Sequence, residues 1–249
     1  MEPAQGRAHP AGSRRSAPGV ALVLLAAGNG SRVGREINKV FLPLAGRRVL
    51  TWSLDSTRRL AGLVTTVVVL QDHDRGHAHE VLRRESDDQR PVELVQGGST
   101  RHESELHGLR ALAPRIEQGE IDVVVIHDAA RPLAAPSLFT EVVDFAARLG
   151  GALPVLAKQG LVFSDGTPVD GRLMTVQTPQ AFVALPLLRA YEAAAREGFV
   201  GSDTASCVER FSELEIHGVP GDAGNIKITF PEDLFLAERL LERSGWRLR

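Results

Sequence analysis

The chain has 249 residues, 43% of them hydrophobic and 24% charged, with a formal net charge of −2 at pH 7. These values suit one α/β domain and give no overall positive field that would attract nucleic acid or an anionic membrane. The single cysteine, Cys207, excludes an internal disulfide and a multi-cysteine metal site; it fits a buried small side chain in a reducing, cytoplasmic compartment.

Residues 1 to 18 differ in composition from the rest of the chain. They carry Arg7, Arg14 and Arg15 among proline, glycine, alanine and serine, without the apolar core of a secretory signal. We predict a disordered extension here, followed by a single domain over residues 19 to 245. An organellar transit peptide is the alternative, which the prolines disfavour because they interrupt an amphipathic helix.

Apolar strands alternate with amphipathic helices along the first two thirds of the chain. Strands are expected at Val20–Leu25, Val64–Leu70, Val92–Val95, Asp122–Ile126 and Ala152–Leu156, and helices at Val49–Leu60, Asp74–Arg84, Thr100–Leu112 and Ser137–Leu149. This order predicts a mostly parallel sheet with helices on both faces. Ligands of such sheets bind beyond the carboxyl ends of the strands, so the loops after the strands are the expected place of a site.

The alternation stops after Leu156. Residues 157 to 175 are rich in glycine and proline, and Asp165-Gly166 between two short apolar runs is a hairpin signal, which predicts a short protruding β-arm. The remaining elements are expected to be helices at Ala184–Glu197 and Asp203–Phe211, a strand at Leu214–Val219, and a helix from Pro231 through Leu240.

The loop after the first strand is the most informative segment. It contains the small residues Ala26, Ala27, Gly28 and Gly30, and Arg32 and Lys39 follow. Backbone N–H groups in such a loop are able to approach a phosphate, and the two cations would neutralise the charge that develops during nucleotidyl transfer. The alternative is a glycine-rich turn without a ligand, since the spacing fits neither the dinucleotide fingerprint nor the Walker pattern.

The segment His127-Asp128-Ala129-Ala130-Arg131 directly follows a buried strand. A carboxylate at that place suits Mg²⁺ or a ribose hydroxyl, although Asp128 could also cap a helix or a turn. Ala129 leaves room for a close ligand. We expect His127 to be a packed, hydrogen-bonded residue, and for Arg131 a phosphate contact and a partner for a nearby acid remain equal alternatives.

Two further segments carry polar groups after strands. Gly97 and Gly98 would let backbone groups reach a flat ligand such as a base, and Ser99 or Thr100 could cap the next helix. Arg101 lies in the first turn of that helix, where a positive charge opposes the helix dipole. This placement is unfavourable unless Arg101 pairs with an anion. Lys227, one of only three lysines in the chain with Lys39 and Lys158, could hold a substrate phosphate or simply cover apolar surface.

These segments, in this order, resemble the 2-C-methyl-D-erythritol 4-phosphate cytidylyltransferase family, one of the cytidylyltransferases that activate sugar and polyol phosphates. The resemblance covers Val20 to about Leu241 and rests on the blocks LAAGNGSR…NK, GGSTRHES, HDAARP, VQTPQAF, SDTAS and NIKITFPEDL. It implies a three-layer α/β/α nucleotidyltransferase fold and a place in isoprenoid biosynthesis. The implied reaction joins CTP and a polyol phosphate with Mg²⁺ and releases pyrophosphate, and the implied assembly is a homodimer formed through the arm.

The resemblance also implies a role for each matching residue. Arg32 and Lys39 match the cations that stabilise the reacting α-phosphate, and Asp128 the acidic position near the ribose and the metal. Ala26, Ala27, Gly28, Gly97, Gly98 and Ser104 match the family's nucleotide pocket, and Lys227 matches the cation near the acceptor phosphate. From the loops themselves we add Gly30, Ser99, Asp128 and Ala129 as candidate nucleotide-binding residues, and Arg131 and Lys158 as candidate acceptor-binding residues.

The departures from the family pattern lie mainly on the acceptor side. The family usually has Pro-Val-x-Asp-Thr where this chain has Pro154 to Lys158, and an arginine where this chain has Asp170; Asn38 stands at a position that is often proline, and Gly224 at one that is often acidic. We therefore consider a different phosphate or phosphonate acceptor as an alternative, with Lys158 or Arg172 as the replacing cation.

Two other functions remain as alternatives. A uridylyl- or guanylyltransferase would share the fold, but the GGSTR segment favours cytidine. A regulatory protein that binds nucleotide without turnover would not need Arg32, Lys39 and Asp128. A dehydrogenase is disfavoured by the glycine spacing.

Overall fold

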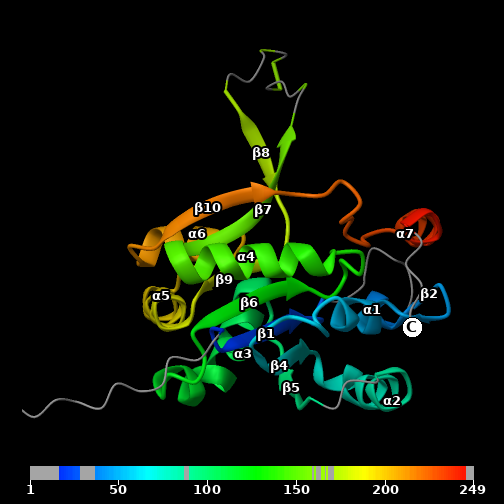
Figure 1. Ribbon diagram of the computed structural model, residues 1–249, viewed down its shortest axis with the longest axis horizontal. Coiled ribbons are helices and arrows are strands. Elements are labelled where there is room, and N and C mark those ends of the chain that lie inside the picture. The colour runs from blue at the N-terminus through cyan, green and yellow to red at the C-terminus, as the bar shows by residue number, and fades with distance from the viewer. Residues whose placement is uncertain are drawn as a thin grey trace, which may run out of the picture.

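The computed structural model describes residues 17–28, 37–86, 90–158, 160, 164–165, 167 and 171–244. Within them, a mostly parallel eight-stranded sheet lies between two layers of helices, as the sequence predicts (Figure 1). The predicted extension, apart from Ala17 and Pro18, lies outside the described residues. No helix among the described residues has the length and apolar character to cross a bilayer.

The strands of the main sheet follow the order β10-β7-β9-β6-β1-β4-β5, and β8 pairs with β7. Their bounds are β1 Val20–Leu25, β4 Leu63–Leu70, β5 Val92–Gln96, β6 Val123–Asp128, β7 Gly150–Lys158, β8 Leu173–Val176, β9 Gln180–Val183 and β10 Glu215–Pro220. A small hairpin joins β2, Pro43–Leu44, to β3, Arg47–Arg48. The helices are α1 Val49–Asp55, α2 Arg75–Glu85, α3 Arg101–Glu117, α4 Pro136–Leu149, α5 Ala184–Glu197, α6 Thr204–Phe211 and α7 Pro231–Ser244, with 3₁₀ turns η2 Lys39–Phe41 and η3 Asp72–Asp74.

The central strand β1 divides the core into two halves. Side chains alternate along a strand, so Leu22 and Leu24 enter one hydrophobic cluster and Ala21 and Val23 the other. The first cluster is covered by α1, α2 and α4, and the second by α3, α5 and α6. Both faces of β1 are buried, which explains why its sequence is a continuous apolar run. Full burial of each such leucine stabilises the fold by about 1.5–3 kcal/mol.

Strands β8 and β9 are absent from the predicted elements. β9 runs antiparallel to both of its neighbours, β6 and β7, and closes the sheet between them. Its four residues follow Thr178-Pro179, a pair that by itself predicts only a turn. Tertiary pairing on both sides therefore makes a strand of a segment too short to show a period-2 pattern.

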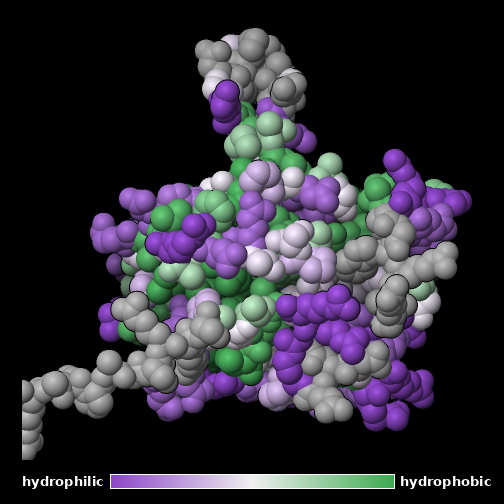
Figure 2. All heavy atoms as spheres, in the orientation of Figure 1, coloured by the Kyte–Doolittle hydropathy of each residue, from purple (hydrophilic) through white to green (hydrophobic). Residues whose placement is uncertain are grey.

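The arm is formed by the outer end of β7 and by β8. The two strands pair antiparallel from Val155 with Val176 to Lys158 with Leu173 and project from the body of the molecule (Figure 1). The β8 side chains of Leu173, Met174 and Val176 are 38–45% exposed, and hydrophobic side chains gather along the stem of the arm (Figure 2). Of the predicted apical hairpin only part is described, and there the backbone N–H of Thr167 donates to the side chain of Asp165. Gly166 and the apolar residues on either side of it lie outside the described residues.

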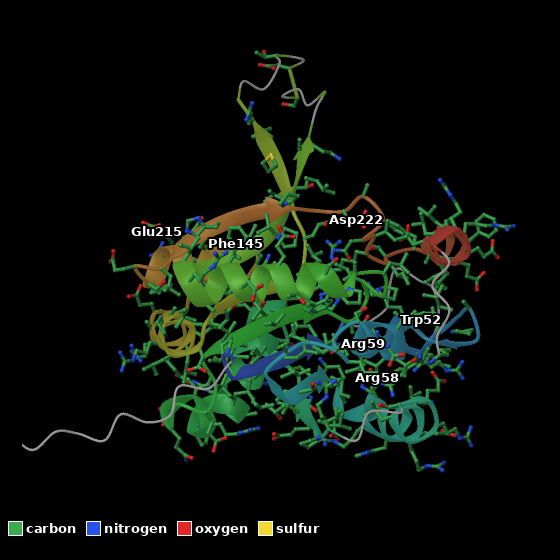
Figure 3. All side chains as sticks on the ribbon, in the orientation of Figure 1. Trp52, Arg58, Arg59, Phe145, Glu215 and Asp222 are labelled. Atoms are coloured by element: carbon green, nitrogen blue, oxygen red, sulfur yellow. The ribbon has the colours of Figure 1, made fainter. Side chains whose placement is uncertain are left out.

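A third, smaller cluster lies beside the main sheet. Trp52 of α1 donates its ring N–H to the carbonyl of Leu44 in β2, 2.8 Å away, and packs with Ile228 and α7 (Figure 3). This contact ties the β2–β3 hairpin to the segment that carries Lys227. The stretch from β1 to α1 is thereby joined to the C-terminal part of the chain.

Helix α6 is fixed at its start by a capping box. The Asp203 side chain accepts from the backbone N–H of Ser206, and the Ser206 hydroxyl accepts from that of Asp203. Cys207 in this helix is fully buried, and burial raises the pKa of its thiol to about 12. The structure thus agrees with the expectation of a buried small side chain for this cysteine.

Candidate functional site

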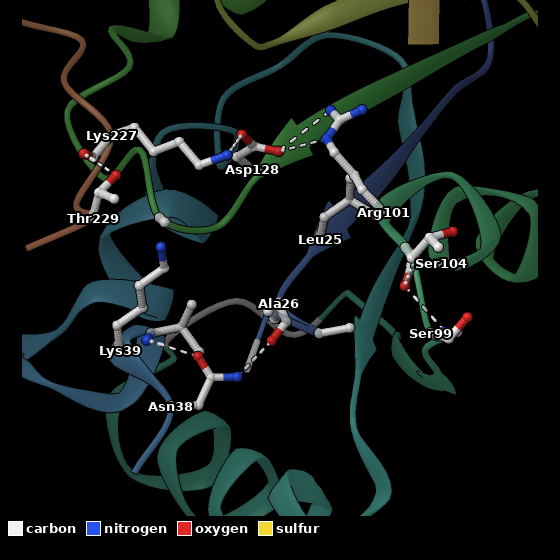
Figure 4. Close-up of a pocket in the computed structure, with 16 residues that line it drawn as sticks. Leu25, Ala26, Asn38, Lys39, Ser99, Arg101, Ser104, Asp128, Lys227 and Thr229 are labelled. Carbon is white, nitrogen blue, oxygen red and sulfur yellow. Dashed lines mark hydrogen bonds and ion pairs between the residues drawn. The ribbon is translucent and has the colours of Figure 1, made fainter. Parts of the chain in front are cut away.

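A cavity of about 440 Å³ lies at the carboxyl ends of β1, β5 and β6. It is lined by Leu25, Ala26, Ala27, Gly28, Asn38, Lys39, Val40, Gly98, Ser99, Thr100, Arg101, Ser104, Asp128, Ala130, Lys227 and Thr229 (Figure 4). The three strands are parallel and lie close together in the sheet, so the loops that follow them meet at one edge, where ligands of this architecture bind.

Asn38 holds the loop after β1 next to the turn that carries Lys39. The side-chain NH₂ group of Asn38 donates to the backbone carbonyl of Ala26 at 2.7 Å and to the carboxylate of Asp74 at 2.9 Å. The side-chain oxygen of Asn38 accepts from the backbone N–H of Val40. Asn38 is 6% exposed, so these bonds are largely shielded from water. Lys39 is the first residue of the η2 turn, and its side chain points into the cavity opposite Lys227 (Figure 4).

The two glycines after β5 serve close packing between loops. A Cβ atom at Gly97 would lie 2.4 Å from the Cβ of Ala27, so only glycine lets the β1 and β5 loops touch here. The N–H of Gly98 donates to the Ser104 hydroxyl at 3.0 Å, and the carbonyl of Gly98 accepts from Gln71 at 3.1 Å. The Gly98 residue is therefore fixed on both of its polar sides at the cavity wall.

Thr100, rather than Ser99, caps helix α3. Its hydroxyl accepts from the N–H of Glu103 at 3.0 Å, while the backbone N–H and the hydroxyl of Ser99 both donate to the Glu103 carboxylate. These bonds fix the turn between β5 and α3.

Asp128 lies at the centre of the charged groups in the cavity. One carboxylate oxygen accepts from Lys227 at 2.7 Å, and the other from the Nε and Nη2 atoms of Arg101 at 3.3 Å (Figure 4). Burial opposes its ionisation, but Arg101, Lys227 and, more weakly, Arg131 hold the pKa of Asp128 well below its usual range. The carboxylate is thus ionised at neutral pH and aimed into the cavity.

His127, the preceding residue, points to the other side of β6. Its ring packs edge-on against Phe139, with centroids 4.9 Å apart, and burial lowers its pKa to about 4. A chain of hydrogen bonds assigns its tautomer: the N–H of Asp128 donates to the Thr178 hydroxyl, which donates to Nδ1, and Nε2–H donates to the carbonyl of Arg131. His127 is therefore a neutral, hydrogen-bonded core residue, as expected.

Arg131 braces the segment that carries Lys227. Its Nη1 donates to the backbone carbonyl of Asn225 at 2.7 Å, and its Nε lies 4.0 Å from the Asp128 carboxylate. Arg131 does not line the cavity. Of its two predicted roles, the geometry therefore favours pairing with an acidic residue, here Asp128, over direct contact with a phosphate. Asn225 in turn donates to the carbonyl of Thr178, which joins this segment to the turn before β9.

The structure brings together most of the predicted site residues that it describes. Those in the cavity wall are Ala26, Ala27, Gly28, Lys39, Gly98, Ser99, Ser104, Asp128 and Lys227. Gly97 and the fully buried Ala129 lie behind the wall, with Ala130 forming the surface in place of Ala129. Lys158 lies at the outer end of the arm, away from the cavity. Gly30 and Arg32 lie outside the described residues.

Seven residues of the cavity wall were not predicted as site residues: the polar Asn38, Thr100, Arg101 and Thr229, and the apolar Leu25, Val40 and Ala130. For Arg101 the sequence does carry a signal, since a cation in the first turn of a helix requires an anion, and Asp128 and Glu105 supply it. The position of Asn38 against Ala26 depends on the fold of the intervening residues and has no comparable signal.

The cavity combines a loop of small residues at a strand end, a lysine that points inward, and an ionised aspartate held between cations. Such a site is suited to bind a nucleotide and to neutralise charge at its phosphates. On this fold, it defines the chain as a nucleotidyltransferase. The family model described as 2-C-methyl-D-erythritol 4-phosphate cytidylyltransferase matches residues 20–243. The chain belongs to that family.

Relatives of known sequence and structure agree with this assignment. The proteins named 2-C-methyl-D-erythritol 4-phosphate cytidylyltransferase from Geobacillus kaustophilus and Prochlorococcus marinus are 36% and 37% identical, each over 88% of this chain and over 95% and 97% of their own length. The crystal structure of 4-diphosphocytidyl-2C-methyl-D-erythritol synthase from Anaerococcus prevotii has a TM-score of 0.77 at 25% identity, and covers 91% of this chain and 97% of its own. The crystal structure of the cytidylyltransferase from Thermus thermophilus has a TM-score of 0.65 at 29% identity, with coverages of 88% and 98%.

Proposed function

We propose that this chain transfers CMP from CTP to 2-C-methyl-D-erythritol 4-phosphate and releases pyrophosphate. The observation that carries the proposal is the convergence of Lys39, Asp128 and the two glycine-bearing loops on one cavity. The curated relatives, which match over nearly their whole length, bear the name of this reaction. The departures on the acceptor side do not change this choice of acceptor, because relatives named for this substrate match 88% of the chain and nearly all of their own length.

The reaction needs positioning and charge neutralisation rather than a protein nucleophile. A phosphate oxygen of the acceptor attacks the α-phosphorus of CTP in line with the bond to the leaving pyrophosphate. Lys39, with Arg32, would offset the charge that grows on the α-phosphate oxygens. Lys227 would hold the acceptor phosphate near the attacked phosphorus, and Ala26 to Gly28, Gly98 and Ser104 would hold the nucleotide.

We propose Mg²⁺ as the metal, with Asp128 as the carboxylate that would hold it. Among the described residues of the cavity wall Asp128 is the one carboxylate, and both of its oxygens already accept hydrogen bonds from Lys227 and Arg101. This donor set fits a Mg²⁺ ion that takes most of its ligands from phosphate oxygens and water, which is usual for nucleotide-bound Mg²⁺. When bound, the metal would withdraw charge from the triphosphate.

We further propose that the chain works as a cytoplasmic homodimer joined through the arm. Lys158 and Arg172 are exposed at the outer end of the arm and do not line the cavity of their own chain. An arm that crosses to a second copy would bring these cations to the partner's acceptor site. The exposed apolar side chains of β8 give such a contact a hydrophobic stem.

The proposal is tested by pyrophosphate release from CTP, UTP or GTP with 2-C-methyl-D-erythritol 4-phosphate and with a panel of other polyol phosphates. We expect turnover with CTP and the methylerythritol phosphate above all other pairs. Lys39→Ala should lower kcat by roughly 100- to 1,000-fold, the usual effect of removing one group that stabilises transition-state charge. Arg84→Ala, on the exposed face of α2, is the control and should turn over as the wild type does.

Tight CTP binding without pyrophosphate formation from any acceptor would instead support the regulatory nucleotide-binding protein. Faster turnover of a different phosphate or phosphonate would support the alternative acceptor. Equal activity of the wild type and Lys39→Ala would contradict the proposed role of the cavity.

A further inference from the structure

Glu105, in the second turn of α3, is a carboxylate that the proposed reaction does not use. Its side chain is fully buried. It accepts hydrogen bonds from Arg101 at 2.5 Å, from the Tyr191 hydroxyl at 2.7 Å and from the Thr204 hydroxyl at 2.6 Å. The three donors come from α3, α5 and the start of α6, so the carboxylate lies where three helices meet.

An ionisable group in such a place is a costly choice for packing alone. Burial raises the pKa of Glu105, while the Arg101 guanidinium and the two hydroxyl donors act in the opposite direction. A well-packed apolar side chain would fill a hydrophobic core at least as well as a buried ion pair. The presence of the carboxylate is explained if its partner, Arg101, needs to be held in one orientation.

Arg101 connects Glu105 to the cavity. One nitrogen of its guanidinium, Nη1, contacts Glu105, and the other edge, Nε and Nη2, contacts one oxygen of Asp128. The second oxygen of Asp128 contacts Lys227. A guanidinium is planar and its donors have fixed directions, so an anchor at Nη1 sets the plane in which the opposite edge meets Asp128.

We propose that Glu105 is a positioning residue for nucleotide binding, which fixes the plane of Arg101 and thereby the direction of the Asp128 carboxylate in the cavity. This inference rests on the proposed function, because it assigns the role through the nucleotide side of that site. Glu105 does not line the cavity. Of its three hydrogen-bond partners described above, Arg101 is the one that belongs to the cavity wall.

The test compares Glu105→Gln with the wild type in calorimetric CTP binding with Mg²⁺, in steady-state kinetics and in thermal unfolding. Glutamine keeps the volume and removes the charge, so we expect the Kd and the KM for CTP to rise about tenfold, as for the loss of one charged hydrogen bond. The KM for the acceptor should change by less than about threefold. A merely structural role would lower the melting temperature and the apparent kcat and leave both KM values unchanged, and that result would overturn the proposal.

Glu192→Gln is the matched control. Glu192 pairs with Arg110 at 2.7 Å and joins the same two helices, α5 and α3, on the exposed surface away from the cavity. This variant should bind CTP as the wild type does. If it weakens CTP binding as much as Glu105→Gln, the effect belongs to helix packing and the proposal is wrong.

A second substitution provides rescue. Thr204 and Arg101 contact the same oxygen of Glu105, so Thr204→Asp places a new carboxylate beside the guanidinium. Added to Glu105→Gln, it should return the CTP affinity to within about threefold of the wild type. Failure of this double variant, if folded, to improve on Glu105→Gln would count against a requirement for a carboxylate at this place.

If Glu105→Gln does not fold, Thr204→Val and Tyr191→Phe each remove one donor and leave the carboxylate in place. Each should weaken CTP binding by about two- to fivefold, and unchanged binding in both would overturn the proposal. A wild-type protein that neither binds nor turns over CTP would refute the proposed function itself. Normal wild-type binding with unchanged affinity in a folded Glu105→Gln variant refutes only the inference.

Discussion

His127 and Asp128 are neighbours at the end of β6 with opposite ionisation behaviour. Successive side chains of a strand point to opposite faces, so one enters the core beside Phe139 and the other enters the cavity between Lys227 and Arg101. Burial keeps the histidine neutral, whereas the surrounding cations keep the aspartate ionised. One residue step along the chain thus separates a core residue from a cavity residue.

The neutral histidine makes the protein sensitive to acid. The pKa of His127 falls from 6.5 in the unfolded chain to about 4 in the native protein, so between these values the unfolded state binds the proton first. The neutral imidazole contributes about 3 kcal/mol to the free energy of unfolding. This contribution is complete above about pH 6.5 and is lost as the pH falls towards 4. We expect urea unfolding at several pH values to show that the free energy of unfolding changes less steeply with pH in this window for His127→Asn than for the wild type.

His79→Asn, on the exposed side of α2, is the control for that experiment. It should retain the wild-type slope of unfolding free energy against pH. Equal slopes in the wild type and His127→Asn would contradict the assignment of a neutral buried imidazole.

Short-range signals account for the site residues that the sequence does predict. Ala26, Gly98 and Asp128 each lie at or just after the end of an apolar strand, and this position alone places them at one edge of a parallel sheet. Glu105 carries no such signal, because a glutamate in an amphipathic helix normally faces water. Its burial depends on Tyr191 and Thr204, which are distant in the sequence, and therefore required the structure.

At the scale of elements, the loop after β1 and the loop after β5 pack closely against each other at the cavity. Gly97→Ala would place a methyl group 2.4 Å from Ala27, so one of the two loops must move. Overpacking of this kind usually costs about 1–3 kcal/mol. We expect CTP binding to weaken at least about tenfold in calorimetry, because the displaced loops form the cavity wall.

Gly76→Ala is the matched variant for this prediction. Gly76 is exposed in the first turn of α2, and apart from its own helix backbone no atom of the described residues lies within 4 Å of a Cβ placed there. It should bind CTP normally and unfold at an equal or higher urea concentration, since alanine favours the helix. Unchanged CTP affinity in a folded Gly97→Ala variant would show that the loops adjust without disturbing the cavity.

The elements that could be predicted are those with a long apolar pattern. β1 and α5 have the bounds that their sequences indicate, and most other helices and strands begin or end within a few residues of the expected position. β8 and β9 could not be predicted, because each is short and owes its strand conformation to pairing, β8 with β7 and β9 with β6 and β7. α1 ends at Asp55, before the expected end at Leu60, and non-helical turns replace its last part.

At the scale of the whole molecule, the arm predicts self-association. Met174 and Val176 are 45% and 43% exposed on a strand that projects from the body, an arrangement more typical of an interface than of a free surface. Sedimentation should therefore give the mass of a dimer at micromolar concentration. Met174→Arg combined with Val176→Arg should shift the equilibrium to the monomer, because like charges would meet across the contact.

Val200→Arg controls for the added charge. Val200 is 61% exposed in the turn between α5 and α6, away from the arm. This variant should keep the mass of the wild type. A wild-type protein that sediments as a monomer, or an arm variant that remains a dimer, would contradict the proposed contact.

The buried thiol of α6 offers a practical advantage. Cys207 is the only cysteine of the chain, and its thiolate is scarcely populated at neutral pH because its pKa is raised to about 12. Maleimide reagents should thus spare it in the folded protein. A single cysteine engineered into the stem of the arm would accept a fluorophore selectively, without prior removal of the native thiol. Energy transfer between labelled chains would then report how close the arms of the proposed dimer lie.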